Sequence, residues 1–277
     1  MLGLLVAGRL AAQEPVLLRL MPPPGQVSRY RTGIRIFMKM PGDSAADSTQ
    51  PFMLQCTDVT QTVDSLGEPG LVRAVTDSAR LLMPGSPGTM PVMIQGMMQG
   101  MTVAQRMDSR GRVLSATVSG PNVPPSVTGG MASAMSAFSQ RMPALADQPV
   151  RVGETWADSQ SVNLAIVGSR GTGWSRLTNR LDSLTQQDGA SIAAISARGS
   201  AHYDVDAPQF ILTASGTATG QTFYDLGHGR PVRTTWRASG QMSIPALGQV
   251  MPFRMTVVTA LVGLGELPGP NPACAAR

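Results

Sequence analysis

Lysine is almost absent from this sequence, and that absence limits what its positive charge can mean. The chain has 277 residues and a formal net charge of +5, yet Lys39 is its single lysine, so nearly all basic residues are arginines. These arginines stand singly among Asp, Ser and Thr, and aromatic residues make up only 4% of the chain. A nucleic-acid-binding surface needs clustered positive charge interleaved with aromatic side chains. The sequence therefore predicts no nucleic-acid partner.

Histidine is also scarce, which leaves little material for catalysis or metal binding. Neither His202 nor His228 lies in a pattern that would supply the three or four ligands of a zinc site. No G-x-S-x-G nucleophile motif occurs. Glu154 and Asp158 could act as paired carboxylates, although polar residues flanking a buried Trp156 are the commoner arrangement. We expect no enzyme, no metal and no cofactor, since a hydrolase would require Glu154, Asp158 and His202 to converge in one cleft.

Long hydrophobic runs are missing as well. No segment reaches the roughly 18 apolar residues that a membrane-spanning helix needs, so no transmembrane segment is predicted. Residues 1–12 contain a short apolar run, Leu2–Ala7, and end at Ala12, which resembles the remnant of a secretory signal peptide. No cysteine follows that run, so the sequence as given has no lipid-attachment motif. These features predict an exported bacterial protein, periplasmic or secreted.

The chain has two cysteines, Cys56 in an alternating segment and Cys274 near the C-terminus. In an oxidising compartment they could form a disulfide that ties the C-terminus to a strand. Alternatively, Cys56 is a buried thiol and Cys274 an unpaired cysteine in a loose tail. The sequence leaves both arrangements open, because it does not show whether the two residues approach each other.

Threonine, valine, serine, glycine and proline are abundant, and this composition favours strands separated by turns. Segment 26–40, QVSRYRTGIRIFMKM, alternates apolar and polar residues in the way typical of a half-buried antiparallel strand. We predict a mainly β protein, with a curved antiparallel sheet or half-barrel built from two related halves and two short helices packed on one side. The predicted divisions are a signal-peptide remnant (1–12), a first β half with methionine-rich helices (13–142), a second β half (143–265) and a flexible tail (266–277).

Two predicted hairpins share one turn chemistry. RMDSRGRV (106–113) and FYDLGHGRPV (223–232) each place an aspartate and a glycine ahead of an arginine. Aspartate accepts hydrogen bonds from the turn backbone, glycine allows a positive φ, and the arginine can pair with the aspartate. We therefore interpret four residues as structural turn residues rather than catalytic groups: Asp108, Gly111, Asp225 and Gly229.

Methionine is unusually frequent in this chain, which contains 18 methionine residues. Many fall at helical spacing in segments 90–101 and 131–142, which predicts two short amphipathic helices. These methionines could simply fill the core, because the flexible thioether packs into irregular spaces. The alternative is an apolar pocket between the helices and the sheet. Its predicted lining residues are Met93, Met97, Met135, Phe138, Trp156 and Trp174.

Two function hypotheses follow from these patterns. The first is a non-catalytic cell-envelope protein that binds an apolar, lipid-like small molecule in that pocket. The second is a structural or interaction protein with a fully packed core, whose edge strands or loops bind another envelope protein. A core without a cavity would favour the second hypothesis.

Four short motifs carry a resemblance to other proteins. They are GQVSRYRT (25–32), MDSRGRV (107–113), QPVRVGETW (148–156) and FYDLGHGRPV (223–232). Through these motifs the chain resembles a family of exported bacterial proteins of unknown function. Its predicted layout of long strands and helices also resembles the half-barrel of periplasmic lipoprotein carriers, which implies a cavity for an apolar ligand. The missing lipid-attachment motif separates this chain from the lipid-anchored members of such groups.

Overall fold

Eleven strands hydrogen-bond into one antiparallel sheet in the computed structural model of the chain. The strands are β1 (Val27–Met38), β2 (Met53–Ser65), β3 (Gly70–Leu82), β4 (Thr102–Met107), β5 (Val113–Ser119), β6 (Thr155–Ile166), β7 (Ser169–Gln187), β8 (Ala190–Ala207), β9 (Phe210–Asp225), β10 (Arg230–Ile244) and β11 (Gln249–Leu261). The structure describes residues 14–20, 22–39, 50–65, 69–84, 89–125, 128–129, 132, 144–166, 169–187, 189–207, 210–245, 248–262 and 274.

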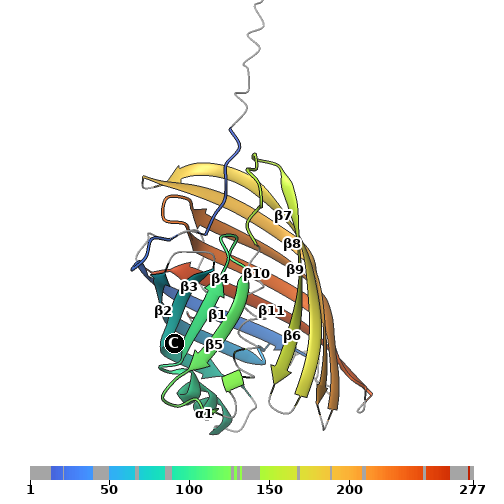
Figure 1. Cartoon of the computed structure of the whole chain (residues 1–277). Helices are drawn as coiled ribbons and strands as arrows, with labels where there is room; N and C mark the ends of the chain where they lie inside the picture. The colour runs from blue at the N-terminus through green and yellow to red at the C-terminus, as the bar shows by residue number, and fades with distance from the viewer. Residues whose placement is uncertain are drawn as a thin grey trace, which may run out of the picture.

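Each half of the chain contributes one meander to the sheet. The strand order is β5-β4-β3-β2-β1-β11-β10-β9-β8-β7-β6, so the two meanders join where β1 pairs with β11. At this joint Tyr30 lies opposite Leu261, and Met38 lies opposite Phe253. The sheet coils strongly, and its two edge strands, β5 and β6, both lie at the front of the view in Figure 1. The prediction of a mainly β fold on a curved antiparallel sheet is confirmed, and the sheet is open rather than closed.

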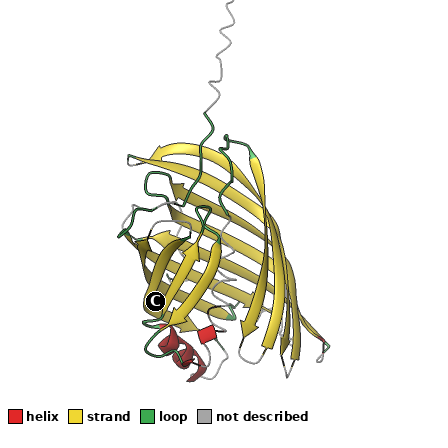
Figure 2. Ribbon diagram, in the orientation of Figure 1, coloured by secondary structure: helices red, strands yellow, loops and turns green. Residues whose placement is uncertain are grey.

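α1 (Thr89–Met98) is the one helix among the described elements, where the sequence predicted two. It links β3 to β4, and the Gln95 side chain accepts a 3.4 Å hydrogen bond from the backbone N–H of Leu81. In Figure 2 it lies at the end of the sheet away from the N-terminal segment. The second predicted helix, 131–142, lies outside the described residues apart from Ala132. No helix in the described part of the chain is long and apolar enough to span a membrane.

Strand alternation gives the sheet a concave and a convex face. On β7, Leu177 and Leu181 are buried on the concave side, whereas Arg176 and Arg180 are exposed on the convex side. Because the side-chain period of a strand is two, the pairing register carries this division across all the neighbouring strands. The concave face therefore holds the packed core, and the convex face carries most of the arginines of the sheet.

Glycines inside the strands permit the tight coiling. Gly216 on β9 pairs with Gly240 on β10. A Cβ atom at Gly240 would lie 2.0 Å from the carbonyl oxygen of Ser215, and one at Gly216 would lie 2.4 Å from that of Ser239. Any side chain at these positions would push the strands apart, so glycine is required where the backbones approach this closely.

The turn between β4 and β5 is organised by its aspartate. Asp108 Oδ1 accepts hydrogen bonds from the backbone N–H groups of Arg110 at 2.9 Å and Arg112 at 2.8 Å. Gly111 adopts a φ of 82°, a conformation that side-chain-bearing residues rarely adopt. Asp108 is thus held by the turn backbone and serves the hairpin.

The turn between β9 and β10 has the same organisation. Asp225 Oδ1 accepts backbone hydrogen bonds from Gly227 at 3.0 Å and His228 at 3.1 Å, and Asp225 Oδ2 lies 2.6 Å from the His228 ring. Gly229 has a φ of 60°. The buried Asp225 carboxylate is therefore occupied by its own turn.

The arginines of these two turns do not pair with the turn aspartates, contrary to the expectation from sequence. Arg112 Nη2 instead lies 2.9 Å from Asp158 Oδ1 on β6, and Arg230 Nη1 donates to Ser28 Oγ on β1 at 2.8 Å. Each aspartate is already satisfied by backbone N–H groups, so its arginine is available to connect the turn to a distant strand.

Cys56 and Cys274 form a disulfide on the convex face. Cys56 on β2 lies opposite Gly33 on β1, and the Cys274 Sγ lies 3.9 Å from the backbone oxygen of the neighbouring Thr32. The bond joins residues 218 positions apart and ties the end of the chain to the middle of the sheet.

Candidate binding site on the concave face

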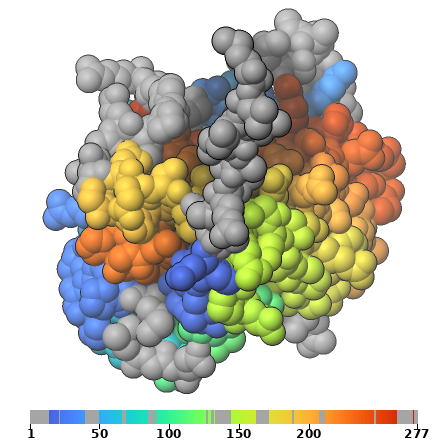
Figure 3. Space-filling model, turned by 90° about the horizontal axis from the view of Figure 1, so that it is seen from above, coloured from blue at the N-terminus to red at the C-terminus, as the bar shows by residue number. Residues whose placement is uncertain are grey.

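Two segments outside the sheet fill one end of the concave face, which we call the closed end. Segments 14–20 and 144–150 meet where Val16 and Val150 exchange backbone hydrogen bonds of 2.8 and 2.9 Å. Figure 3 shows the N-terminal segment (blue) beside the yellow-green residues that lead into β6. The buried cluster at this end consists of Leu18, Leu145, Ala146, Val150, Leu181, Ala193, Ile195 and Tyr224.

Polar contacts hold both segments in place at the closed end. Arg19 donates to the backbone oxygens of Ala146 and Asp147, each at 2.7 Å, and the hydroxyl of Tyr224 donates to the Arg19 oxygen at 2.8 Å. Burial raises the pKa of Tyr224 well above its usual value and raises the pKa of Tyr30 to about 12, so both hydroxyls stay neutral. A cavity beside Tyr30 measures about 20 Å³, room for one water molecule. This cavity is too small for a lipid-like ligand.

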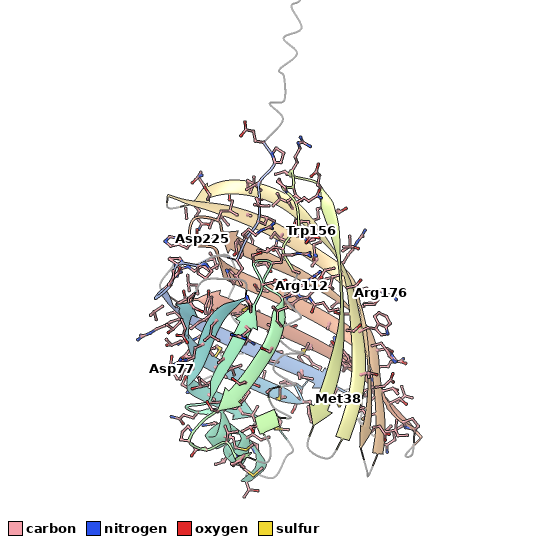
Figure 4. All side chains as sticks on the ribbon, viewed as in Figure 1. Met38, Asp77, Arg112, Trp156, Arg176 and Asp225 are labelled. Atoms are coloured by element: carbon pink, nitrogen blue, oxygen red, sulfur yellow. A yellow bond between two sulfur atoms is a disulfide. The ribbon has the colours of Figure 1, made fainter. Side chains whose placement is uncertain are left out.

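An ion pair with a buried carboxylate joins the β4–β5 turn to edge strand β6 beside the closed end. Asp158 on β6 is 1% exposed and receives Arg112 from the β4–β5 turn. Its second oxygen accepts hydrogen bonds from Gln160 Nε2 at 2.8 Å and from the backbone N–H of Ala144 at 3.4 Å. The indole of Trp156 donates to the Ala144 oxygen at 2.8 Å, and Figure 4 shows Trp156 and Arg112 in this region. Side chains therefore connect β5 to β6 here, in a sheet whose strand order leaves both strands as edges.

One row of residues crosses the concave face next to the closed end. The register aligns Trp156, Asn179, Ala197, Gly220 and Trp236 on consecutive strands from β6 to β10. The indole of Trp236 lies against Gly220, where a Cβ atom would come within 2.7 Å of the ring. Trp236 also packs with Leu177 and Ala197, so its ring extends across β9 toward Asn179.

This row contains polar groups that are buried without a partner in the described structure. Asn179 is 0% exposed, and neither its Oδ1 nor its Nδ2 has a hydrogen-bond partner there. The Nε1 of Trp236 in this row also lacks a partner there, and so does the Oε1 of Gln160, four residues along β6 from Trp156. An unpaired buried polar group costs about 1–3 kcal/mol, so these groups are candidates for contact with a polar molecule.

Beyond this row the concave face is apolar on β9, β10, β11 and β1, whereas β6 and β7 carry Asp158, Gln160 and Ser175 there. A strip on β9 and β10 carries small residues: Ala214, Gly216, Ala218, Ala238 and Gly240. Larger side chains, mostly half-buried, flank the strip: Ile34, Ile36, Met38, Met242, Met251, Phe253, Met255 and Val257. From Trp236 to Met242 the strip runs six residues along β10, which corresponds to about 20 Å. We call this region the apolar strip.

Two of the predicted pocket residues are tryptophans, and they lie on opposite sides of the sheet. Trp156 packs against the closed end. Trp174 is on the convex face and 38% exposed, with the His202 ring 6.1 Å away and Arg176 Cζ 5.0 Å from its ring centroid. Strand alternation turns its neighbour Gly173 inward, so Trp174 lies on the face opposite Trp156.

Four residues of the predicted pocket belong to the two predicted helices. Met93 on α1 is 60% exposed to solvent, while Met97 on the same helix is half-buried. Met135 and Phe138 lie outside the described residues. The apolar side chains that flank the strip come from the sheet and include Met242, Phe253 and Met255.

The residues considered for hydrolysis do not converge. Asp158 is buried on the concave face in its ion pair, Glu154 is exposed in the turn before β6, and His202 lies on the convex face, 2.9 Å from Asp204. Within the described ranges, no group of three or more His, Cys, Asp or Glu residues is arranged to hold a metal ion.

Comparison with known proteins assigns no family. No protein-family model matches the chain, and no curated protein matches it either. Similar solved structures include an exported-type protein of YmcC-like fold from Bacteroides fragilis, at 9% identity over 87% of this chain and 96% of that chain, with a TM-score of 0.25. Another is the hypothetical lipoprotein YmcC from Escherichia coli, at 8% identity over 82% of this chain and 85% of that chain, with a TM-score of 0.18. A third is OmpF from Salmonella typhi in complex with daunomycin, at 6% identity over 86% of this chain and 98% of that chain, with a TM-score of 0.27. TM-scores this low carry no functional argument.

Proposed function

We propose that this protein is an exported, non-catalytic binding protein that holds one lipid-like amphiphile against the concave face of its sheet. The observation that supports it most directly is the unpaired, fully buried amide of Asn179 on β7, two strands away from the β9 part of the apolar strip on the same face. An amphiphile needs both features, because its polar group requires hydrogen-bond partners and its tail requires apolar surface.

The chemistry of the strip favours a flexible hydrocarbon tail. Small residues on β9 and β10 leave backbone and Cβ surface accessible, and Met242, Met255 and Phe253 flank them with adaptable or planar apolar groups. Methionine accommodates irregular apolar shapes well. The strip length of about 20 Å suits an extended acyl chain better than a compact ring system.

The proposed location outside the cytoplasm is supported by the Cys56–Cys274 disulfide. Disulfides of this kind persist in oxidising compartments such as the bacterial periplasm and are rare in the cytosol. The engagement of Asp108, Asp158 and Asp225 in turns and an ion pair supports the non-catalytic part of the proposal.

Asn179→Leu tests the polar end of this site. The substitution removes an unpaired buried amide at similar volume, so we expect the free energy of unfolding to stay the same or rise by about 1–3 kcal/mol. Binding of radiolabelled palmitate should fall by about tenfold, because the carboxyl group loses its partner. Urea unfolding and equilibrium dialysis measure the two quantities. Unchanged palmitate binding in a stably folded variant would contradict the proposal.

Met242→Asp tests the apolar end, and Ser243→Asp is its matched control. Both place one carboxylate near the end of β10, but Met242 lies on the concave face and Ser243 on the convex face. We expect Met242→Asp to abolish palmitate binding, since a charge in the apolar strip opposes burial of the tail. Equal binding by both variants would favour the alternative function, an interaction protein with a packed interior.

A further inference from the structure

The convex face carries two adjacent rows of residues in which every charged side chain is an arginine. The first row runs across six strands as Thr178, Arg198, Thr219, Arg237, Thr256 and Arg35. The second, two residues along each strand, runs as Arg176, Ser200, Thr217, Ser239, Arg254 and Phe37. We call these twelve positions the arginine lattice; among them, the residues other than arginine and Phe37 all carry hydroxyl groups.

The charges of the two central arginines of this lattice, Arg198 and Arg237, are not neutralised by carboxylates in the described part of the chain. Arg198 and Arg237 are exposed, and neither makes an ion pair or side-chain hydrogen bond within the described part of the chain. The nearest acidic residues on this face of β7 and β8 are Asp182 and Asp204. These face Arg180 at 3.7 Å and His202 at 2.9 Å, respectively.

The spacing of the arginines is regular because it follows the strands. Arg198 and Arg237 are two strands apart, and so are Arg237 and Arg35, which corresponds to about 10 Å for each interval. Threonine hydroxyls occupy the strand between each pair. A linear polyanion lying across the strands would meet a cation at every second strand and a hydroxyl group between.

We propose that the arginine lattice binds an extended anionic polysaccharide. Guanidinium groups form paired, charge-assisted hydrogen bonds with carboxylates, and the intervening hydroxyls can donate to and accept from sugar hydroxyls. This surface is on the opposite side of the sheet from the proposed lipid site, so the two proposals are independent.

Other polyanions fit this surface less well. Single-stranded nucleic acid binds through bases stacked on open aromatic rings. Here Arg176 lies 5.0 Å from the Trp174 ring centroid, and Arg254 lies 5.2 Å from that of Phe37, so arginines already cover both rings. A flat bilayer would touch a strongly curved convex sheet over a narrow band, whereas a flexible glycan can follow the curvature.

The test compares two double variants of the full-length protein in binding to sodium alginate, a polyuronate, at low salt. Arg198→Gln/Arg237→Gln removes the central cations of the lattice. Arg80→Gln/Arg106→Gln removes the same net charge from exposed positions on β3 and β4, outside the lattice. We expect alginate affinity to fall by about tenfold or more in the first variant and to change little in the second.

Three outcomes would overturn the proposal. One is an equal loss in both double variants, which would indicate general charge attraction. Another is no binding of alginate by the wild-type protein. The third is tighter wild-type binding to an oligothymidylate or to phosphatidylglycerol vesicles than to alginate, which would assign the lattice to a nucleic acid or a membrane surface. Neutral dextran serves as the uncharged control and should not bind.

Discussion

Replacing Cys274 with serine is expected to lower the free energy of unfolding by about 2–5 kcal/mol. The disulfide to Cys56 closes a loop across a sequence separation of 218 residues. Cross-linking positions so far apart restricts the unfolded chain strongly, although the balance of entropy and enthalpy in such bonds is model-dependent. Urea unfolding of the oxidised wild type and the variant measures the difference.

Reduction supplies the control for this prediction. Dithiothreitol should shift the wild-type unfolding curve toward that of Cys274→Ser and leave the variant unchanged. Palmitate binding should persist in the folded variant, because the disulfide lies on the convex face. Coincident curves for oxidised wild type and variant would show that the bond contributes nothing to stability.

Replacing Arg112 with methionine is expected to lower the free energy of unfolding by about 3–5 kcal/mol. Asp158 is 1% exposed, so removing its cation leaves a buried carboxylate without charge compensation. The expected loss exceeds that of an ordinary ion pair, because the same carboxylate also organises Gln160 and Ala144. Chemical denaturation gives the magnitude, and hydrogen exchange in β5 and β6 should show whether the two edges separate.

Two further variants make the Arg112 prediction specific. Arg151→Met breaks an exposed pair with Glu154, 3.5 Å apart, and should cost at most about 1 kcal/mol. The double variant Arg112→Met/Asp158→Asn should recover part of the loss, since a neutral amide needs no cation. A cost for Arg112→Met no larger than that of Arg151→Met would contradict the role assigned to this pair.

The strands and hairpins could be predicted from sequence because their signals are local. Alternation within segment 26–40 places Tyr30 and Ile34 on one face, and the aspartate–glycine turns at Asp108 and Asp225 mark where strands reverse. These patterns need no knowledge of distant partners. The curved antiparallel sheet followed from them directly.

The closed end could not be predicted in the same way. Segment 144–150 (ALADQPV) shows neither the period of a helix nor that of a strand. Leu145 and Val150 become core residues through contact with Leu18 and Leu181, which are far away in the chain. Tertiary packing determines such burial, and local propensity carries no signal for it.

The two proposed binding surfaces also depend on register between distant strands. In the sequence, nothing distinguishes Asn179 from other strand residues. Only the structure shows that its side chain is buried on the concave face with an unpaired amide. Arg198 and Arg237 stand singly in the sequence, which indicated scattered charge, yet strand pairing brings them into one row. The position of Trp174 on the convex face depends on register in the same way, since aromatic content alone does not tell which face a strand residue occupies.

The most direct test of the account is native mass spectrometry of the wild-type protein purified from an exporting bacterial host, followed by organic extraction of whatever is bound. The account predicts one lipid-like molecule at near-stoichiometric ratio, with a single polar group and a hydrocarbon tail that fits the strip of about 20 Å. A bare protein mass together with an empty extract would contradict it and would point to a packed interaction protein.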